Sequence, residues 1–309
     1  MPRTNIKNNI NKIIAIINII KNINPKNIRN KIARGNAINK INIKYNLNLK
    51  SILFNFAITK AINMWIINIA IMIGLKEIKN YLDGSENPLI FFDDDSDGLA
   101  SFLLIYKYLG KGKGIIVTHP ILDESYLRKV EEYRPDLILL LDKHGISQEF
   151  IDKVNVPIIW IDHHPIIDVK GVKYFNPKFI NIKDNRPTSY WCYEIVKENL
   201  WIAMVGIVAD WDLEHYEEFC NKYKDLANPN LKEPPEVLFN TKLGLLAKLF
   251  TFILTGKSDD VKKSINILSR INDPYELLDK TTPRGKFIYK RFEKLNNDYE
   301  RILHDALKN

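Results

Sequence analysis

Four carboxylates crowd into the stretch 93–97, which reads Asp-Asp-Asp-Ser-Asp. They follow the apolar run 89–92 and precede Gly98 and a second apolar run. Carboxylates this close repel one another unless cations neutralise them, and their hard oxygens suit Mg²⁺ or Mn²⁺. The stretch therefore indicates a divalent metal site. The alternative is a solvated acidic turn that caps a helix at Leu99, and the stretch alone favours neither interpretation.

Two later stretches offer matching chemistry. Asp142 follows the apolar run 136–141, and Asp162, His163 and His164 follow the run 156–161. A neutral imidazole suits Mn²⁺ better than Mg²⁺. If these residues join the acidic stretch, Mn²⁺ is the first choice of metal and Mg²⁺ the second.

The pattern of apolar runs predicts where these residues lie. Buried strands are expected at 89–92, 113–118, 136–141 and 156–161, separated by helices at 99–109, 123–133 and 147–153. This alternation predicts an α/β fold with a doubly wound parallel sheet. Because ligands bind beyond the carboxyl ends of such strands, three polar strand ends at one edge favour a site over a helix cap.

The rest of the chain is predicted to be mainly helical. We expect a short edge strand at 173–177 and helices at 187–200, 201–208, 238–254, 259–271 and 286–308. The second of these helices ends at Asp210, beside Trp211. Pro229, Pro234 and Pro235 predict a loop before the last helices.

The first quarter of the chain has an unusual composition. Residues 1–50 contain 14 asparagines, and residues 1–76 contain 13 lysines and arginines but no acid. Three interpretations stay open: a basic arm that binds nucleic acid or a partner, a membrane anchor around 51–74, or untranslated DNA read in frame. Lys60 and several asparagines interrupt the apolar part, which argues against a membrane span. We favour the third, with Met72 or Met64 as the true start.

Charge and cysteine content narrow the class of protein. The net charge of +8 comes from that first quarter, because the remaining residues carry 32 basic and 37 acidic side chains. The overall charge therefore gives no argument for nucleic-acid binding by the rest of the chain. Two cysteines form no disulfide framework, and no secretory signal is present, so we expect a cytoplasmic protein.

Four motifs in order resemble the DHH phosphoesterase superfamily, which includes RecJ exonucleases, oligoribonuclease/pAp phosphatases and family II pyrophosphatases. They are the acidic stretch with Gly98, then Asp142, then Asp162-His163-His164, and last Asp210. The resemblance covers about residues 75–254. It implies a DHH phosphoesterase domain at 72–228 between an extension, 1–71, and a helical tail, 229–309.

The resemblance also implies two Mn²⁺ or Mg²⁺ ions and a role for each motif residue. Asp95 would hold the first ion, with Asp93 contributing to it or orienting its water. The second ion would be held by Asp97, His163 and Asp210, and Asp142 would bridge both. His164 would contact the substrate phosphate, and Asp162 would support the histidines. Substrate contacts are further expected from Ser101, Arg186, Thr188 and Ser189.

Three departures from the family pattern bear on the substrate. Phe91 replaces a histidine of some relatives, which argues against a pyrophosphatase. Lys143-His144-Gly145 after Asp142 is unusual, and His144 could be an extra ligand or a loop residue. The glycine-rich clamp of most relatives is not visible, so it is missing or replaced by the basic cluster that contains Arg284 and Lys286.

The expected function is metal-dependent hydrolysis of phosphodiester bonds in single-stranded DNA or RNA or short oligonucleotides, as in a RecJ-like exonuclease. Alternatives are a phosphatase or phosphodiesterase for a small nucleotide such as pAp or a cyclic dinucleotide, and a non-catalytic scaffold of the replication machinery. In the first case a replication or repair protein could be a partner.

Overall fold

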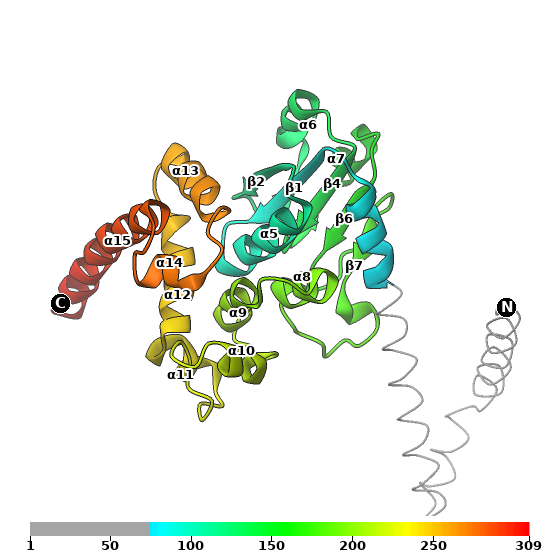
Figure 1. Cartoon of the computed structure of the whole chain (residues 1–309). Helices are drawn as coiled ribbons and strands as arrows, with labels where there is room; N and C mark the ends of the chain where they lie inside the picture. Colours follow the sequence, from blue (N-terminus) through cyan, green and yellow to red (C-terminus); the bar gives the residue numbers. More distant parts are fainter. Residues whose placement is uncertain (1–73, 309) are drawn as a thin grey trace, which may run out of the picture. The chain divides into compact units, whose positions relative to one another are not determined.

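The computed structural model describes residues 74–308. A helix over 74–84 leads into alternating strands and helices, and helices follow to the end of the described chain (Figure 1). The strands are β1 Pro88–Asp93, β2 Lys113–Val117, β3 Ile121–Leu122, β4 Leu137–Leu141, β5 Gly145–Ile146, β6 Ile158–Ile161 and β7 Lys173–Phe175. The helices within the sheet region are α5 Ser96–Leu109, α6 Leu127–Tyr133 and α7 Gln148–Lys153, with short 3₁₀ turns at Glu124–Tyr126 and Pro177–Phe179. The later helices are α8 Thr188–Val196, α9 Leu200–Ala209, α10 Tyr216–Lys222, α11 Pro234–Asn240, α12 Lys242–Ile253, α13 Ser258–Leu268, α14 Pro274–Leu278 and α15 Pro283–Lys308.

A five-stranded sheet in the order β2-β1-β4-β6-β7 forms the centre of the described structure, and every pairing in it is parallel. The chain moves outward from β1 to β2 and then returns past β1 to β4, so the direction of winding reverses between β1 and β4. The predicted doubly wound sheet is confirmed. In folds of this type, such a reversal leaves a crevice at the carboxyl ends of the strands where ligands bind.

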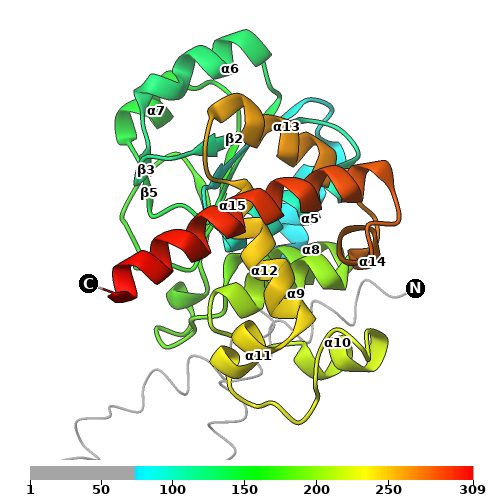
Figure 2. The same ribbon diagram turned by 90° about the vertical axis from the view of Figure 1, so that its left-hand side faces the viewer.

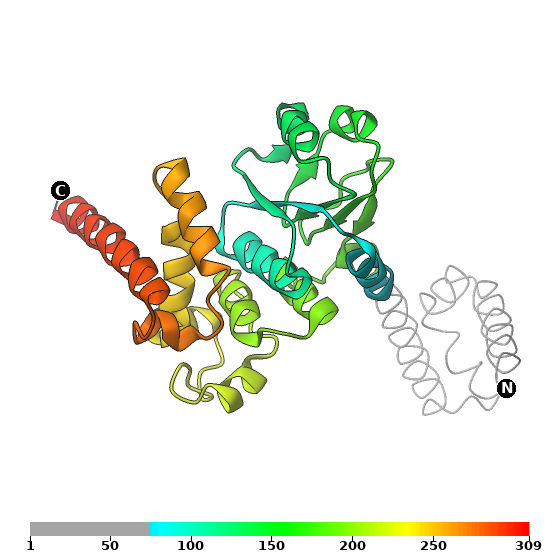
Figure 3. The same cartoon turned by 45° about the horizontal axis from the view of Figure 1, so that its top comes forward.

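Helices cover both faces of the sheet, which explains why its central strands are apolar throughout. Side chains alternate along β1: Ile90 and Phe92 pack in the core with α5, α8 and α9, whereas Leu89 and Phe91 pack in the second core with α6 and α7. Figure 3 shows these two layers on opposite sides of the sheet. The sheet is therefore a rigid support for whatever follows its strand ends.

The tail is built on α9, the most apolar helix of this region. All but the last of its ten residues are buried, because α9 lies between α5 and α8 on one side and α12 on the other. In turn α15 lies across α12, as Figure 2 shows. This packing brings α12, a helix of the predicted tail, close to the carboxyl edge of the sheet.

Several predicted boundaries need correction. The helix expected over 187–200 ends at Val196, where Lys197 takes a left-handed conformation with φ of 56°. The helix expected over 238–254 is two helices that meet at Thr241, which caps the second through Gly244 N. Pro234 and Pro235 open α11 rather than a loop, since proline suits the first helical turn. The short pair β3 and β5, α10 and α14 were not predicted.

The interpretations of residues 1–71, and the true start at Met72 or Met64, lie outside the described residues. Within residues 74–308, no helix is long and apolar enough to cross a membrane.

Candidate metal centre

Asp95 and Asp97 are fixed where β1 passes into α5. Asp95 is the N-cap of α5, and its Oδ1 accepts a hydrogen bond of 2.8 Å from Gly98 N. Asp97 is buried and accepts hydrogen bonds of 2.8 and 2.9 Å from the backbone N–H groups of Thr188 and Ser189. The sequence left a helix cap and a metal site as alternatives for this stretch. In the structure one turn provides both a helix cap and candidate metal ligands.

Gly98 permits this tight turn. A Cβ there would lie 2.7 Å from the carbonyl oxygen of Asp93, so no larger residue fits without a shift of the backbone. The first turn of α8 also points its N–H groups at Asp97, and the positive end of a helix dipole favours a carboxylate.

Asp142 leaves β4 in a left-handed conformation, with φ of 60°. Its side chain is 1% exposed and accepts a hydrogen bond of 2.9 Å from Thr188 Oγ1. Asp93, at the end of β1, forms a 2.6 Å ion pair with the ammonium group of Lys143. The ends of the two strands that flank the winding reversal therefore both contribute carboxylates.

The motif Asp162-His163-His164 follows β6. Asp162 is fully buried, and its Oδ1 lies 2.7 Å from His164 Nδ1. Tyr174 OH and Asn176 Nδ2 hold the other oxygen of Asp162 at 3.0 and 3.2 Å. This network fixes the ring of His164 and leaves its Nε2 free of Asp162.

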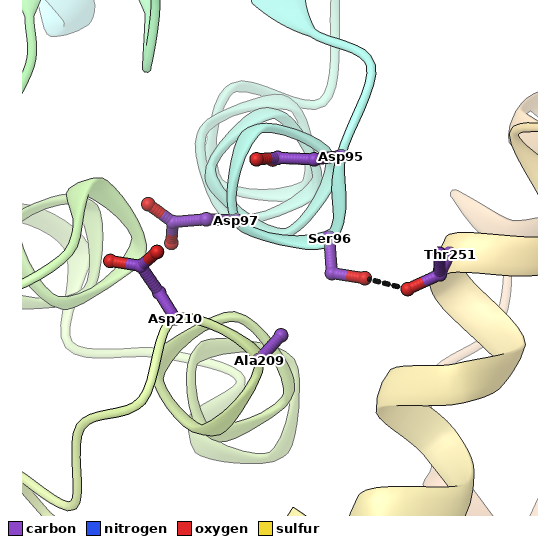
Figure 4. A pocket seen from close by; sticks show the side chains of 6 residues that line it. All are labelled: Asp95, Ser96, Asp97, Ala209, Asp210 and Thr251. Atoms are coloured by element: carbon purple, nitrogen blue, oxygen red, sulfur yellow. Dashed lines mark hydrogen bonds between the residues drawn. The ribbon is translucent and has the colours of Figure 1, made fainter.

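His163 turns toward a different set of groups. Its Nε2 lies 3.5 Å from Asp142 Oδ1 and 3.6 Å from Asp210 Oδ2. Asp210 comes from the end of α9 and lines a cavity of about 130 Å³ together with Asp95, Ser96, Asp97, Ala209 and Thr251 (Figure 4). Figure 4 shows the carboxylates of Asp97 and Asp210 next to each other.

These side chains form three overlapping groups of donors. They are Asp97, His163 and Asp210; Asp93, Asp95 and Asp142; and Asp142, His163 and His164, with the donor atoms of each group within 4.8 Å of one another. The donors are carboxylate oxygens and imidazole nitrogens, which suit Mn²⁺ and also Mg²⁺. The residues present therefore fit a pair of divalent cations that share Asp142.

The electrostatics of this cluster also favour bound cations. Burial, followed by the charges of Asp97 and Asp95, raises the pKa of Asp210 to about 8. Burial and the charge of Asp97 raise the pKa of Asp95 to about 6, and burial raises that of Asp142 well above its ordinary value. Burial lowers the pKa of His163, which keeps its imidazole neutral and able to bind metal.

The family model for the DHH family, N-terminal domain, matches residues 87–228. Those residues belong to the DHH superfamily. The match begins one residue before β1 and ends in the loop before α11, so it contains all the donor residues of the cluster.

Two solved structures share the fold of the DHH domain. One is RecJ in complex with Mn²⁺ from Thermus thermophilus, with a TM-score of 0.52 and 16% identity over 76% of this chain and 39% of that chain. The other is the DHH domain of a member of a family of ribosomal proteins, with a TM-score of 0.56 and 12% identity over 80% of this chain and 64% of that chain. No curated protein matches the chain significantly in sequence. At these identities the comparisons show the fold, and the match spans well under half of the RecJ structure.

The structure brings the predicted metal residues of the DHH domain together but corrects three of the predicted substrate contacts. Ser101, Thr188 and Ser189 each have 0% exposed surface. Thr188 and Ser189 face inward because their N–H groups hold Asp97, and Ser101 lies on the buried face of α5. These residues therefore position the cluster rather than contact a substrate.

The contacts of Arg284, near the start of α15, show where it lies relative to the acidic edge of the DHH domain. Near the end of α5, Lys107 Nζ donates to Asn272 Oδ1 at 3.0 Å. The backbone N–H of Asn272 donates to Glu276 Oε1 at 2.8 Å, and Glu276 Oε2 lies 3.7 Å from the guanidinium of Arg284. Since α5 begins at the acidic edge, Arg284 lies near its opposite end, roughly 15–20 Å away at 1.5 Å per residue. Arg284 therefore does not lie beside the carboxylates of the centre, and a role of Arg284 and Lys286 as the substrate clamp stays a prediction.

Arg186 lies beside the start of α8, and its guanidinium is bound by both oxygens of Asp184 and by Tyr190 OH. It keeps 27% of its side chain exposed, so its contact with a substrate stays a prediction.

Two contributors were missed by sequence reasoning. Thr251 of α12 binds Ser96 Oγ at 2.8 Å and lines the cavity, although it lies in the predicted tail. No local pattern marks it, because its place depends on the packing of α12. Lys143 did carry a signal, since its position after Asp142 departs from the family pattern.

Proposed function

We propose that this chain is a divalent-metal-dependent phosphoesterase that hydrolyses phosphodiester bonds in single-stranded nucleic acid or short oligonucleotides, with Mn²⁺ as its preferred metal. The observation that carries the proposal is the set of three donor groups, linked through Asp142 and His163, at the carboxyl edge of the sheet. In this proposal Asp97, His163 and Asp210 would hold one ion, Asp95 with help from Asp93 would hold the other, and Asp142 would serve both. Ions held here would lower the pKa of a water molecule and neutralise charge on the attacked phosphate.

The chain supplies its own phosphate contact through His164. Burial lowers the pKa of His164, but the hydrogen bond and charge of Asp162 outweigh that effect and raise it overall. The bond from Asp162 occupies Nδ1, so Nε2 is the nitrogen available for a substrate. A protonated Nε2–H would donate to a phosphate oxygen and stabilise negative charge that develops on it.

Trp211 supports a substrate that carries nucleobases. It follows Asp210 directly, is 60% exposed and has a left-handed φ of 63°. A large aromatic side chain in this backbone conformation is uncommon and is maintained by its surroundings. Exposed aromatic rings beside a phosphate site stack on bases without regard to sequence.

A phosphoesterase for small nucleotides is the second candidate, and the wall formed by α12 favours it. Thr251 and Ser96 close one side of the cavity beside Asp95, Asp97 and Asp210. If the first candidate function is correct, a replication or repair protein would supply the basic surface that binds a longer strand. We place this activity in the cytoplasm. The intact donor set argues against a scaffold without catalytic activity.

The test is a hydrolysis panel with the full chain and Mn²⁺: a long single strand, a dinucleotide, pAp and pyrophosphate, each with and without EDTA. Cleavage of the dinucleotide or the strand that EDTA abolishes supports the first candidate. Release of phosphate from pAp alone would favour the second. Absence of metal-dependent cleavage of all four would contradict the proposed function.

A further inference from the structure

The ammonium group of Lys143 lies inside the cluster of donors. Its side chain is 3% exposed, and its Nζ lies 2.6 Å from Asp93 Oδ1 and 3.0 Å from the carbonyl oxygen of Val117. Its own carbonyl oxygen accepts a 3.1 Å hydrogen bond from the indole N–H of Trp160. A buried ammonium group persists only when it is paired, so these contacts fix Lys143 at both ends.

The same carboxylate oxygen of Asp93 also accepts a hydrogen bond of 2.8 Å from Asp94 N. Oδ1 of Asp93 is therefore fully engaged, and the carboxylate cannot offer both oxygens to a cation. In the donor group Asp93, Asp95 and Asp142, the charge of Asp93 is therefore already neutralised by Lys143.

The other donor group has no such internal cation. In the described part of the chain, Asp97 accepts hydrogen bonds from backbone N–H groups, and Asp210 Oδ2 lies 3.6 Å from the neutral imidazole of His163. Neither carboxylate is paired with a lysine or arginine within residues 74–308. The two cation positions thus differ in charge although both are built from carboxylates.

We propose that Lys143 makes the two cation positions unequal in affinity. The position at Asp97, His163 and Asp210 fills first, and the position at Asp93, Asp95 and Asp142 fills last and releases its ion most easily. The physical cause is repulsion between the Lys143 ammonium and a divalent cation held a few ångströms away in a poorly solvated site. Lys143 is a positioning residue: it orients Asp93 and sets the affinity of one position. This inference rests on the two-cation centre of the proposed function.

The experiment measures binding of Mn²⁺ alone to the full chain, without substrate. Calorimetry follows the binding steps, and electron paramagnetic resonance reports when two neighbouring Mn²⁺ ions become exchange-coupled. In the unaltered chain we expect two steps of different affinity, with the coupled spectrum appearing only after the second. Lys143→Gln removes the charge and keeps a hydrogen-bond donor, and it should tighten the second step by about tenfold or more because the repulsion is lost.

Two further variants keep the result interpretable. Lys143→Arg retains the charge and should keep the second step weak. Lys111→Gln removes a half-exposed lysine that pairs with Glu86, and it should change neither step. If Lys143→Gln folds poorly without metal, Lys143→Met measured in the presence of Mn²⁺ takes its place, with the same expected result.

Equal affinities in the unaltered chain, or a second step that neither neutral variant strengthens, would overturn the unequal positions and leave the proposed function standing. Failure of the unaltered chain to bind any Mn²⁺ would instead contradict the two-cation centre, and this inference with it.

Discussion

At the scale of single residues, the centre depends on carboxylates that the fold forces together. Asp142 is the clearest case, since it contributes to two of the three donor groups and is almost fully buried. Thr188 Oγ1 donates to it at 2.9 Å, and an asparagine would keep that contact.

We therefore predict that Asp142→Asn abolishes metal-dependent hydrolysis while the fold persists. Without metal, the variant should be more stable than the unaltered chain at pH 8, because a buried charge beside Asp97 and Asp95 is removed. Melting curves in EDTA and Mn²⁺ titrations check both points. Full activity in the variant would rule out a shared ligand at this position.

Asp210 gives a prediction about pH. Its pKa is about 8 in the folded, metal-free chain, against about 4 for an unfolded aspartate. Between these values the folded state holds a proton that the unfolded chain has released, so the contribution of Asp210 to stability falls as pH rises. The melting temperature of Asp210→Asn relative to the unaltered chain should therefore rise from pH 5 to pH 8 in EDTA. A difference that does not change with pH would contradict the assigned pKa.

Trp211 allows a direct test of base stacking. The described part of the chain contains four tryptophans, of which Trp160, Trp191 and Trp201 are at most 1% exposed. Within that part, the fluorescence of solvent-exposed tryptophan therefore comes from Trp211. We predict that a dinucleotide quenches this fluorescence and that an abasic analogue does not. Trp211→Ala should weaken dinucleotide binding by roughly tenfold, within the 1–3 kcal/mol of one stacked base. Tyr299→Ala, another exposed aromatic, is the control.

At the scale of elements, close packing of α9 determines where Asp210 lies. Gly206 lets α9 approach its neighbours: a Cβ there would lie 2.7 Å from Ser189 Cβ on α8 and 2.8 Å from Ala100 Cβ on α5. These two helices carry or hold Asp97, so the distance between α9 and its neighbours also sets the distance between Asp97 and Asp210.

Gly206→Ala should thus destabilise the protein by about 1–3 kcal/mol, the usual cost of overpacking, and weaken Mn²⁺ binding as well. Gly84→Ala is the matched control, since a Cβ at Gly84 meets nothing within 4 Å. Denaturant unfolding and Mn²⁺ titration of both variants measure the effect. If Gly206→Ala loses stability but binds Mn²⁺ normally, the helix spacing does not control the site.

At the scale of the whole molecule, charge distribution limits how a long strand can bind. Beyond residue 76 the chain is net acidic, and Arg284 lies near the end of α5 that is remote from the centre. A long strand binds mainly through many basic contacts, each of which steepens the salt dependence.

We predict that a chain beginning at Met72 cleaves short oligonucleotides, binds long single-stranded DNA weakly and shows a shallow salt dependence. Comparison with the full chain separates the contribution of residues 1–71, whose lysines and arginines should steepen the salt slope if they bind the strand. Tight binding by the shorter chain at physiological salt would reveal a nucleic-acid channel in the helical tail.

The sequence by itself determined the parallel sheet and predicted the candidate donor residues that the structure brings together. Strands buried on both faces are apolar along their whole length, so a polar residue such as Asp142 marks the strand end where ligands bind. Each of these patterns lies within one short segment, and the four motifs follow one another in the order expected from the family resemblance.

Only the tertiary structure decided what surrounds the donors. The burial of Ser101, the remoteness of Arg284 from the centre and the place of Thr251 at the cavity all follow from how α8, α12 and α15 pack. The ion pair of Lys143 with Asp93 joins the loop that follows β4 to the end of β1. Such contacts depend on distances between elements far apart in the chain, and a pattern within one element contains no information about those distances.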